Sequence, residues 1–281
     1  MTCPNCGEPA SGGVNFCRSC RASLNPQYDA EATSALSRPV EVSLPNQQNE
    51  KPDPEKLWWE GFELCQKARS LEVDGHFEKS QRLIERAMCL WMQALENEVQ
   101  GNSEVTCHWF LGNEFYDKAV DLEEHFRLSK EPLDQIPTLA KGVTHLERAI
   151  ELDALIGNFV FGNKENQADL LKLDVVWGSQ ARYIKGNYGI EPAISYIVEK
   201  IKLIQHLHVL LPDLFYSFGM CYAEANDVDS AMTMFRAAIN AEDYGDVIDH
   251  EDSRYRIAQI AKKNAANNLK YLETHGRAPR I

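Results

Sequence analysis

The stretch "FYSFGMCYAEANDVDSAMTMFRAAINAED", residues 215–243, holds two apolar segments separated by a short polar turn. In the first segment apolar residues such as Phe215 and Phe218 recur every three or four positions, so they share one face of a helix. Asn226 and Asp227 interrupt this pattern with side chains that favour turns. The stretch therefore predicts two helices joined by a tight connection.

Small residues mark the point where these two helices would cross. Gly219 lies on the first helix and Ala231 on the second, twelve positions later. Small side chains let two helices approach closely, so a larger residue at Gly219 should clash. The same spacing recurs twice upstream, which indicates a repeated hairpin. The upstream pairs are Ala68 with Ser80 and Ala181 with Ala193.

A further unit has the same residue types with a longer connection. Gly112 in "WFLGNEFY" and Gly142 in "GVTHLERAI" are thirty residues apart instead of twelve. We expect the first helix of this unit to run past His125. Pro132 and Pro137 should then punctuate the loop that follows.

The pattern of residues 215–243 resembles the tetratricopeptide repeat (TPR) at nearly every signature position. The resemblance implies an all-α fold for residues 57–281, a TPR-like helical-hairpin solenoid closed by a capping helix with one polar face. Residues 156–173 fit no repeat and should form a long loop or a short irregular helix. The expected units lie near 61–97, 105–155 with an insertion at 126–137, 174–207 with its turn at 186–189, and 212–245, followed by a terminal helix at 251–274.

Four cysteines at the start of the chain form two Cys-x-x-Cys pairs, and they are Cys3, Cys6, Cys17 and Cys20. In a reducing compartment such pairs bind metal or carry out redox chemistry. A thioredoxin-like redox site would use one pair on a βα unit, whereas two pairs supply all four ligands of a tetrahedral zinc ion. We therefore predict one structural Zn²⁺ at these cysteines, with a redox role as the alternative.

The motif "Cys-Pro-Asn-Cys-Gly" resembles the first knuckle of the zinc-ribbon family, and the resemblance covers residues 1–23. Arg21 stands where that family usually carries glycine. A segment this short cannot bury a sufficient core, so zinc would supply its folding free energy, about 10–16 kcal/mol. Residues 24–56 contain five prolines and no sustained periodicity, which predicts a flexible linker.

The overall composition narrows the functional classes. The chain has 281 residues, 44% of them hydrophobic, which is enough for a substantial core. Its net charge of −13 argues against a surface built to hold nucleic-acid phosphates or anionic lipids. The sequence shows neither a signal-peptide pattern nor the roughly 18 uninterrupted apolar residues of a membrane span. We therefore expect a cytoplasmic protein with no membrane partner.

The predicted solenoid points to protein binding. No Ser/His/Asp or Cys/His set and no glycine-rich phosphate loop can be assembled, so we do not expect an enzyme. The TPR resemblance implies that the first helices of the units line a concave face that binds a protein or peptide. A mixture of aromatic, asparagine and cationic residues suits a peptide, and an acidic one in particular. The expected lining residues are Phe62, Arg69, Trp109, Asn113, Tyr116, Arg182, Lys185, Tyr216 and Met220.

These features together predict a non-enzymatic adaptor, in which the repeats capture a protein segment and the zinc ribbon contacts a second partner. A first alternative is a nucleic-acid- or polymerase-associated regulatory factor that acts through the ribbon, where Arg18 and Arg21 offer a small positive patch. A second alternative is an enzyme with a site near residues 159–172, although no motif there indicates a reaction.

Overall fold

The computed structural model describes residues 51–119 and 130–277. In these ranges every regular element is a helix, so the expected all-α class holds for the described part of the chain. No helix in the same ranges is both long and apolar enough to cross a membrane. The predicted zinc ligands, most of the predicted linker and the expected helical extension past His125 lie outside the described residues.

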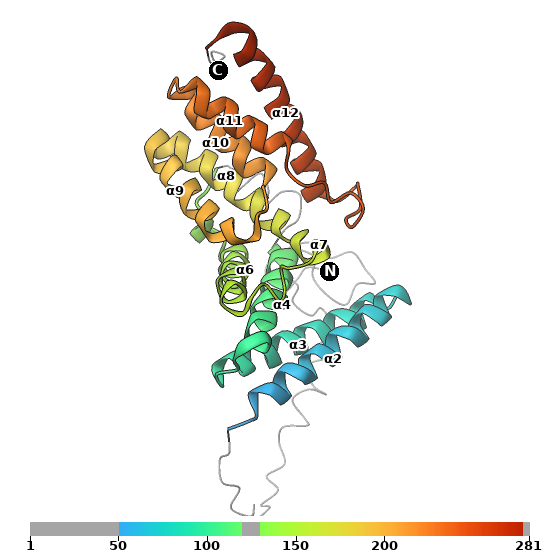
Figure 1. Ribbon diagram of the computed structural model, residues 1–281. Helices are drawn as coiled ribbons and strands as arrows, with labels where there is room; N and C mark the ends of the chain where they lie inside the picture. Colours follow the sequence, from blue (N-terminus) through green and yellow to red (C-terminus); the bar gives the residue numbers. More distant parts are fainter. Residues whose placement is uncertain (1–50, 120–129, 278–281) are drawn as a thin grey trace, which may run out of the picture. The chain divides into compact units, whose positions relative to one another are not determined.

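The first half of the described chain forms two hairpins. Helix α2 (Pro54–Val73) packs along α3 (Phe77–Glu96), and α4 (Gly101–Ala119) packs along α6 (Pro137–Ile156), as Figure 1 shows. Helix α2 begins within the predicted linker because Pro54 suits the first helical turn and the Asp53 carboxylate accepts the Glu55 backbone N–H at 3.0 Å. The linker predicted to reach residue 56 therefore ends earlier.

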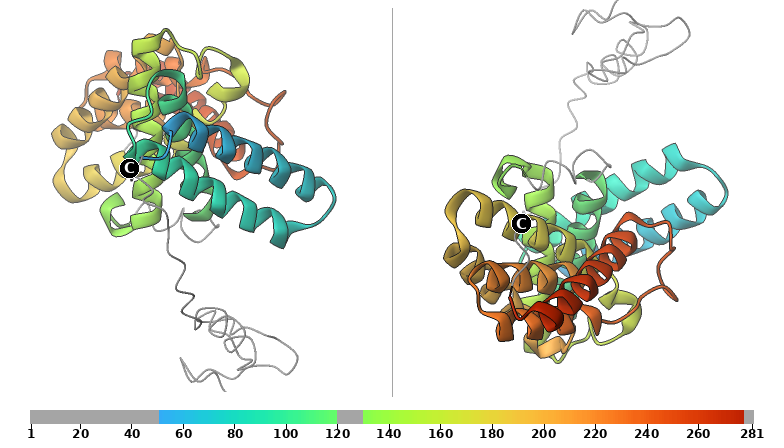
Figure 2. Two further views of the ribbon diagram at one scale, coloured as in Figure 1. Left: turned by 90° about the horizontal axis from the view of Figure 1, so that it is seen from below. Right: turned by 90° about the horizontal axis from the view of Figure 1, so that it is seen from above.

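Two more hairpins and a terminal helix follow. Helix α8 (Leu170–Tyr188) precedes α9 (Ile190–Ile204), and α10 (Pro212–Glu224) packs along α11 (Val228–Ile239). The last helix, α12 (Ser253–His275), packs against both α10 and α11 and also touches α8, which Figure 2 shows from above. Short elements fill the connections: η1 (Leu133–Gln135), α7 (Lys164–Gln167) and η2 (Gln205–Leu207).

Glycines allow the close helix crossings that the sequence predicts. A Cβ atom added to Gly142 on α6 would lie 2.8 Å from the Tyr116 backbone nitrogen and 3.1 Å from the Gly112 carbonyl oxygen of α4. A Cβ atom added to Gly219 would lie 2.5 Å from the ring of Phe235. All three distances are shorter than ordinary van der Waals contact, so each crossing favours glycine.

The turn expected at residues 186–189 is wrong in extent. Helix α8 continues through Tyr188, and the chain reverses at Gly189 alone, whose φ of 98° is a conformation that glycine adopts readily. Gly186 is a helical residue in the structure. A single residue with positive φ is enough to join α8 to α9, so no longer loop is needed.

The segment that fits no repeat is partly helical. It contains α7, and α8 begins at Leu170, four residues before the predicted unit. The buried carboxylate of Asp153 fixes the loop between α6 and α7 by accepting the backbone N–H groups of Val160 at 2.8 Å and Phe161 at 2.9 Å. The sequence pattern hides this extra helical turn because every residue of α8 from Leu170 to Ala181 is buried and no polar face remains.

Large buried aromatic residues mark the core along the described chain. Trp91 centres a cluster formed by α2, α3 and α4, and Trp177 lies in a larger cluster shared by α4, α6, α8 and α9. Phe235 packs in a third cluster with residues of α10 and α12. Each hairpin thus buries its apolar faces against its neighbours, which positions the first helices α4, α8 and α10 and the terminal helix α12 relative to one another.

Candidate functional site

The nine predicted lining residues fall into three groups in the structure. Phe62 and Arg69 lie on α2, and a second group on α4 faces the start of α8. A third group comes from α8 and α10 and converges on one hollow. The α4 group is Trp109, Asn113 and Tyr116, and the third group is Arg182, Lys185, Tyr216 and Met220.

The two residues of the α2 group do not share an environment. Phe62 stacks against Trp58, with ring centroids 6.0 Å apart, and also meets Phe110 of α4. Arg69 is exposed to solvent. Phe62 therefore belongs to the packing between α2 and α4.

The third group lines a small hollow of about 80 Å³ between α8 and α10, which we call the Met220 hollow. Four predicted residues from two consecutive hairpins meet there. The complete lining is Ala181, Arg182, Lys185, Tyr216, Ser217, Met220 and Cys221.

One cation of the Met220 hollow, Arg182, is paired within the protein, although 37% of its side chain is exposed. The Arg182 guanidinium donates to both carboxylate oxygens of Asp213, at 2.7 and 2.9 Å, and to the hydroxyl of Ser217 at 2.9 Å. Asp213 is buried, as is Asp174, whose carboxylate accepts the backbone N–H groups of Asp213 and Leu214 at the start of α10. Burial, together with the neighbouring Asp213 carboxylate, raises the pKa of Asp174 above its ordinary value.

The second cation of the Met220 hollow is paired as well. Lys185 forms an ion pair with Glu224 of α10. Because Arg182 and Lys185 both have carboxylate partners, the hollow does not offer the free positive charge that binding of an acidic peptide would need. The sequence could not reveal this pairing, because Asp213 and Glu224 lie 31 and 39 residues away along the chain.

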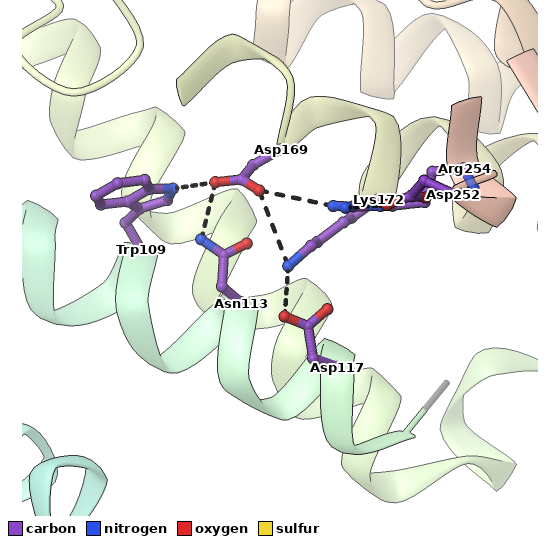
Figure 3. Close-up of polar contacts among 7 residues, drawn as sticks. All are labelled: Trp109, Asn113, Asp117, Asp169, Lys172, Asp252 and Arg254. Atoms are coloured by element: carbon purple, nitrogen blue, oxygen red, sulfur yellow. Dashed lines mark hydrogen bonds and ion pairs between the residues drawn. The ribbon is translucent and has the colours of Figure 1, made fainter. Parts of the chain in front are cut away.

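The α4 group joins a polar cluster where α4, α8 and α12 meet, drawn in Figure 3. At its centre one oxygen of the Asp169 carboxylate accepts the Trp109 indole N–H and the Asn113 amide N–H, each at 3.0 Å. Asp169 immediately precedes α8, so these bonds fix the start of α8 against α4. We call this arrangement the Asp169 cluster.

Two cations extend the Asp169 cluster toward α12. The Lys172 ammonium donates to the Asp117 carboxylate at 2.9 Å and lies 3.8 Å from Asp169 (Figure 3). The Arg254 guanidinium lies 3.7 Å from Asp169 and donates through Nε to Asp252 at 2.9 Å. Three carboxylates thus surround two cations.

Tyr116 lies beside this cluster with an unsatisfied hydroxyl group. Its side chain is only 2% exposed, and within the described residues its hydroxyl has no hydrogen-bond partner. Leaving a buried polar group without a partner is unfavourable. Tyr116 lines a hollow of about 250 Å³, which we call the Tyr116 hollow. Its other lining residues are Asp117, Asp252, Ser253 and Arg254.

Sequence reasoning missed most of the Asp169 cluster. It predicted Trp109, Asn113 and Tyr116 as lining residues of a concave face, and Tyr116 is buried in the structure. Asp169 and Lys172 lie in the segment assigned to no repeat, and Arg254 lies near the start of the capping helix. One available signal was the lysine in an otherwise apolar run, "DLLKLDVVW" at residues 169–177, because a buried lysine needs a partner.

Metal ligands can be assessed only within the described residues. There, no group of three or more His, Cys, Asp or Glu side chains is arranged to hold a metal ion. Two histidines do meet across the α4–α6 hairpin, with the Nδ1 atoms of His108 and His145 2.8 Å apart. Burial and the neighbouring His145 lower the pKa of His108 to about 4, and burial also lowers the pKa of His145.

Comparison with known proteins gives no assignment. No protein-family model, no curated protein and no solved structure matches this chain. The chain's function must be inferred from its own residues and their contacts.

Proposed function

We propose that the chain is a non-enzymatic protein-interaction adaptor whose residues 57–281 form a TPR-like solenoid that binds a partner segment. One observation carries this proposal: lining residues predicted on two different first helices, α8 and α10, meet at the Met220 hollow. Successive hairpins with glycine or alanine at their crossings support the TPR-like architecture, because such crossings let the first helices lie side by side.

The contacts of the Met220 hollow define what it would bind. Its two cations are paired with carboxylates of the same chain, so the accessible apolar surface comes from the half-buried Tyr216 and Met220. Methionine adapts its shape to different apolar groups. The hollow is smaller than the roughly 300–1,000 Å³ typical of sites for drug-sized ligands. We infer that it receives one small apolar side chain of an extended partner segment.

The test of this function is a matched pair of substitutions in the full-length chain. Met220→Glu places a charge in the hollow, and Met92→Glu places the same charge on the 37%-exposed surface of α3. Affinity capture with both variants should show a set of partners that Met220→Glu loses and Met92→Glu keeps. Circular dichroism must show both variants folded. If both variants captured the same partners in equal amounts, binding at the Met220 hollow would be contradicted.

The zinc-ribbon part of the proposal has a separate test. Two Cys-x-x-Cys pairs supply a closed ligand shell, so one zinc ion per chain would be held by Cys3, Cys6, Cys17 and Cys20. Elemental analysis of the purified chain should find about one zinc per chain, and Cys17→Ser should lower that content strongly. Retention of a full equivalent by Cys17→Ser would contradict the assignment.

A further inference from the structure

We propose that the Tyr116 hollow binds a lysine or arginine side chain of the partner polypeptide, and so gives the array a preference for basic segments. This proposal rests on the proposed function, because it requires a partner polypeptide. It assigns to the junction of α4 and α12 a recognition role that is separate from the apolar Met220 hollow.

The first argument is the unsatisfied Tyr116 hydroxyl. Tyr116 lines the hollow together with Asp117, Asp252 and Arg254, and its buried hydroxyl has no hydrogen-bond partner among the described residues. A hydroxyl oxygen can accept a hydrogen bond from a ligand donor.

The second argument is the distribution of charge. The cations of the cluster are enclosed, with only 4% of the Lys172 side chain and 20% of the Arg254 side chain exposed. The Asp117 side chain is 58% exposed, so a carboxylate is the charge that a ligand reaches first. Its Oδ2 atom accepts from Lys172, while its Oδ1 atom can accept another donor.

The charges around the Tyr116 hollow favour a cationic ligand over an anionic one. Three carboxylates face two cations in this cluster, so an added ammonium or guanidinium group balances the local charge. An added carboxylate would instead lie beside Asp117 and Asp252. The net charge of −13 for the whole chain would also favour encounter with a basic partner.

The hollow has the size of one side chain. Its volume of about 250 Å³ lies below the range typical of sites for drug-sized molecules. An ammonium group has three donors, and the acceptors that line the hollow include the Asp117 carboxylate and the Tyr116 hydroxyl. A guanidinium group has enough donors for the same two acceptors.

The experiment selects ligands from a random peptide library displayed on phage, with the full-length chain as bait. The enriched peptides should contain lysine or arginine at a fixed position. A synthetic peptide of the enriched sequence is then measured by calorimetry against the wild-type chain and against Tyr116→Phe and Asp117→Asn. We expect each variant to weaken binding about 3- to 10-fold, and Asp134→Asn, which alters an exposed carboxylate of η1, to leave it unchanged.

The peptide itself supplies the matching control. Replacing its fixed lysine or arginine by the uncharged norleucine should weaken binding to the wild-type chain, and this loss should largely disappear with Asp117→Asn. Thermal unfolding of each variant shows whether it is folded, and Tyr116→Phe removes a single hydroxyl that has no partner to lose.

The outcomes separate this proposal from the proposed function. Enriched peptides without a basic preference, or with acidic residues, would overturn the basic-side-chain site and leave peptide binding intact. Enriched basic peptides whose affinity is unchanged in Tyr116→Phe and Asp117→Asn would place their binding elsewhere and would also overturn it. A selection that enriches no peptide at all would count against both proposals.

Discussion

The Met220 hollow and the Tyr116 hollow use charge in opposite ways. At the Met220 hollow the positive charge of Arg182 is balanced by Asp213 and hydrogen-bonded to two serines, so an apolar surface remains for a ligand. At the Tyr116 hollow the cations are enclosed, but Asp117 stays exposed and the Tyr116 hydroxyl has no partner among the described residues. The difference teaches that a charged side chain on a binding face indicates its ligand only after its internal partners are known.

The largest change in stability is expected when one cation is removed from each region. Arg182→Met should lower the free energy of unfolding by about 3–5 kcal/mol, because it leaves buried Asp213 and Asp174 without their counter-charge. Lys172→Met should cost less, about 1–2 kcal/mol, because its partner Asp117 remains solvated. Urea unfolding followed by circular dichroism measures both. Equal losses would show that the two networks do not differ in this way.

A second test disturbs the crossing of α6 with α4 next to Tyr116. Gly142→Ala should lower the free energy of unfolding by about 1–3 kcal/mol, because its new methyl group would lie 2.8 Å from the Tyr116 nitrogen. Gly186→Ala on α8 is the matched control, since a Cβ there meets nothing within 4 Å. That change should stabilise the protein by up to about 1 kcal/mol through helix propensity. Thermal unfolding of both variants should therefore show shifts of opposite sign.

A third test uses pH to probe the other contact between α4 and α6. His108 and His145 share a hydrogen bond that cannot form when both Nδ1 atoms carry protons. The lowered pKa values mean that the unfolded chain binds these protons more readily than the folded protein. The stability from the neutral pair is thus present above pH 6.5 and lost as pH falls toward about 4. Other charged groups near this pair are Arg148, Lys141 and Glu104.

The size of this pH effect should be about 1–2 kcal/mol once partial solvent exposure is allowed for. His145→Gln should reduce the dependence between pH 6.5 and 4, because it removes one of the two titrating histidines, while burial still lowers the pKa of His108. Urea unfolding at half-unit steps of pH measures this slope in both proteins. An unchanged slope in the variant would assign the pH dependence to other groups.

The smallest expected effect is on stability in Tyr116→Phe. The hydroxyl has no partner within the described residues, so its removal should change the free energy of unfolding by less than about 0.5 kcal/mol, or raise it slightly. Thermal unfolding in the absence of ligand measures this. A loss above about 1.5 kcal/mol would show that the hydroxyl makes a stabilising hydrogen bond in the unliganded protein.

The sequence predicted local features well. Helical periodicity placed residues 215–243 on two helices, and the structure has α10 and α11 there with the turn at Asn226, whose φ is 61°. It also identified Gly219 as a position that a larger residue would disrupt, and the contact with Phe235 agrees. Periodicity failed at Leu170, because the first three turns of α8 are buried on every side and so show no polar face.

The candidate site was harder to predict, because it depends on contacts between distant residues. Helix position suggested that Arg182 and Trp109 line a binding face, yet each is hydrogen-bonded to a carboxylate 31 or 60 residues further along the chain. The same holds for the Tyr116 hollow, which needs α12 to approach α4. Residue spacing along one helix cannot contain that information.

The sequence by itself determined the features that act over a few residues: the periodic apolar faces, the glycines at turns and crossings, and the Cys-x-x-Cys spacing that predicts a zinc site. Only the tertiary structure decided which charges are neutralised inside the protein and which remain for a partner. The physical reason is that a salt bridge or an unpaired hydroxyl depends on atoms within a few ångströms, and at α4, α8, α10 and α12 the packing brings together atoms from distant parts of the chain.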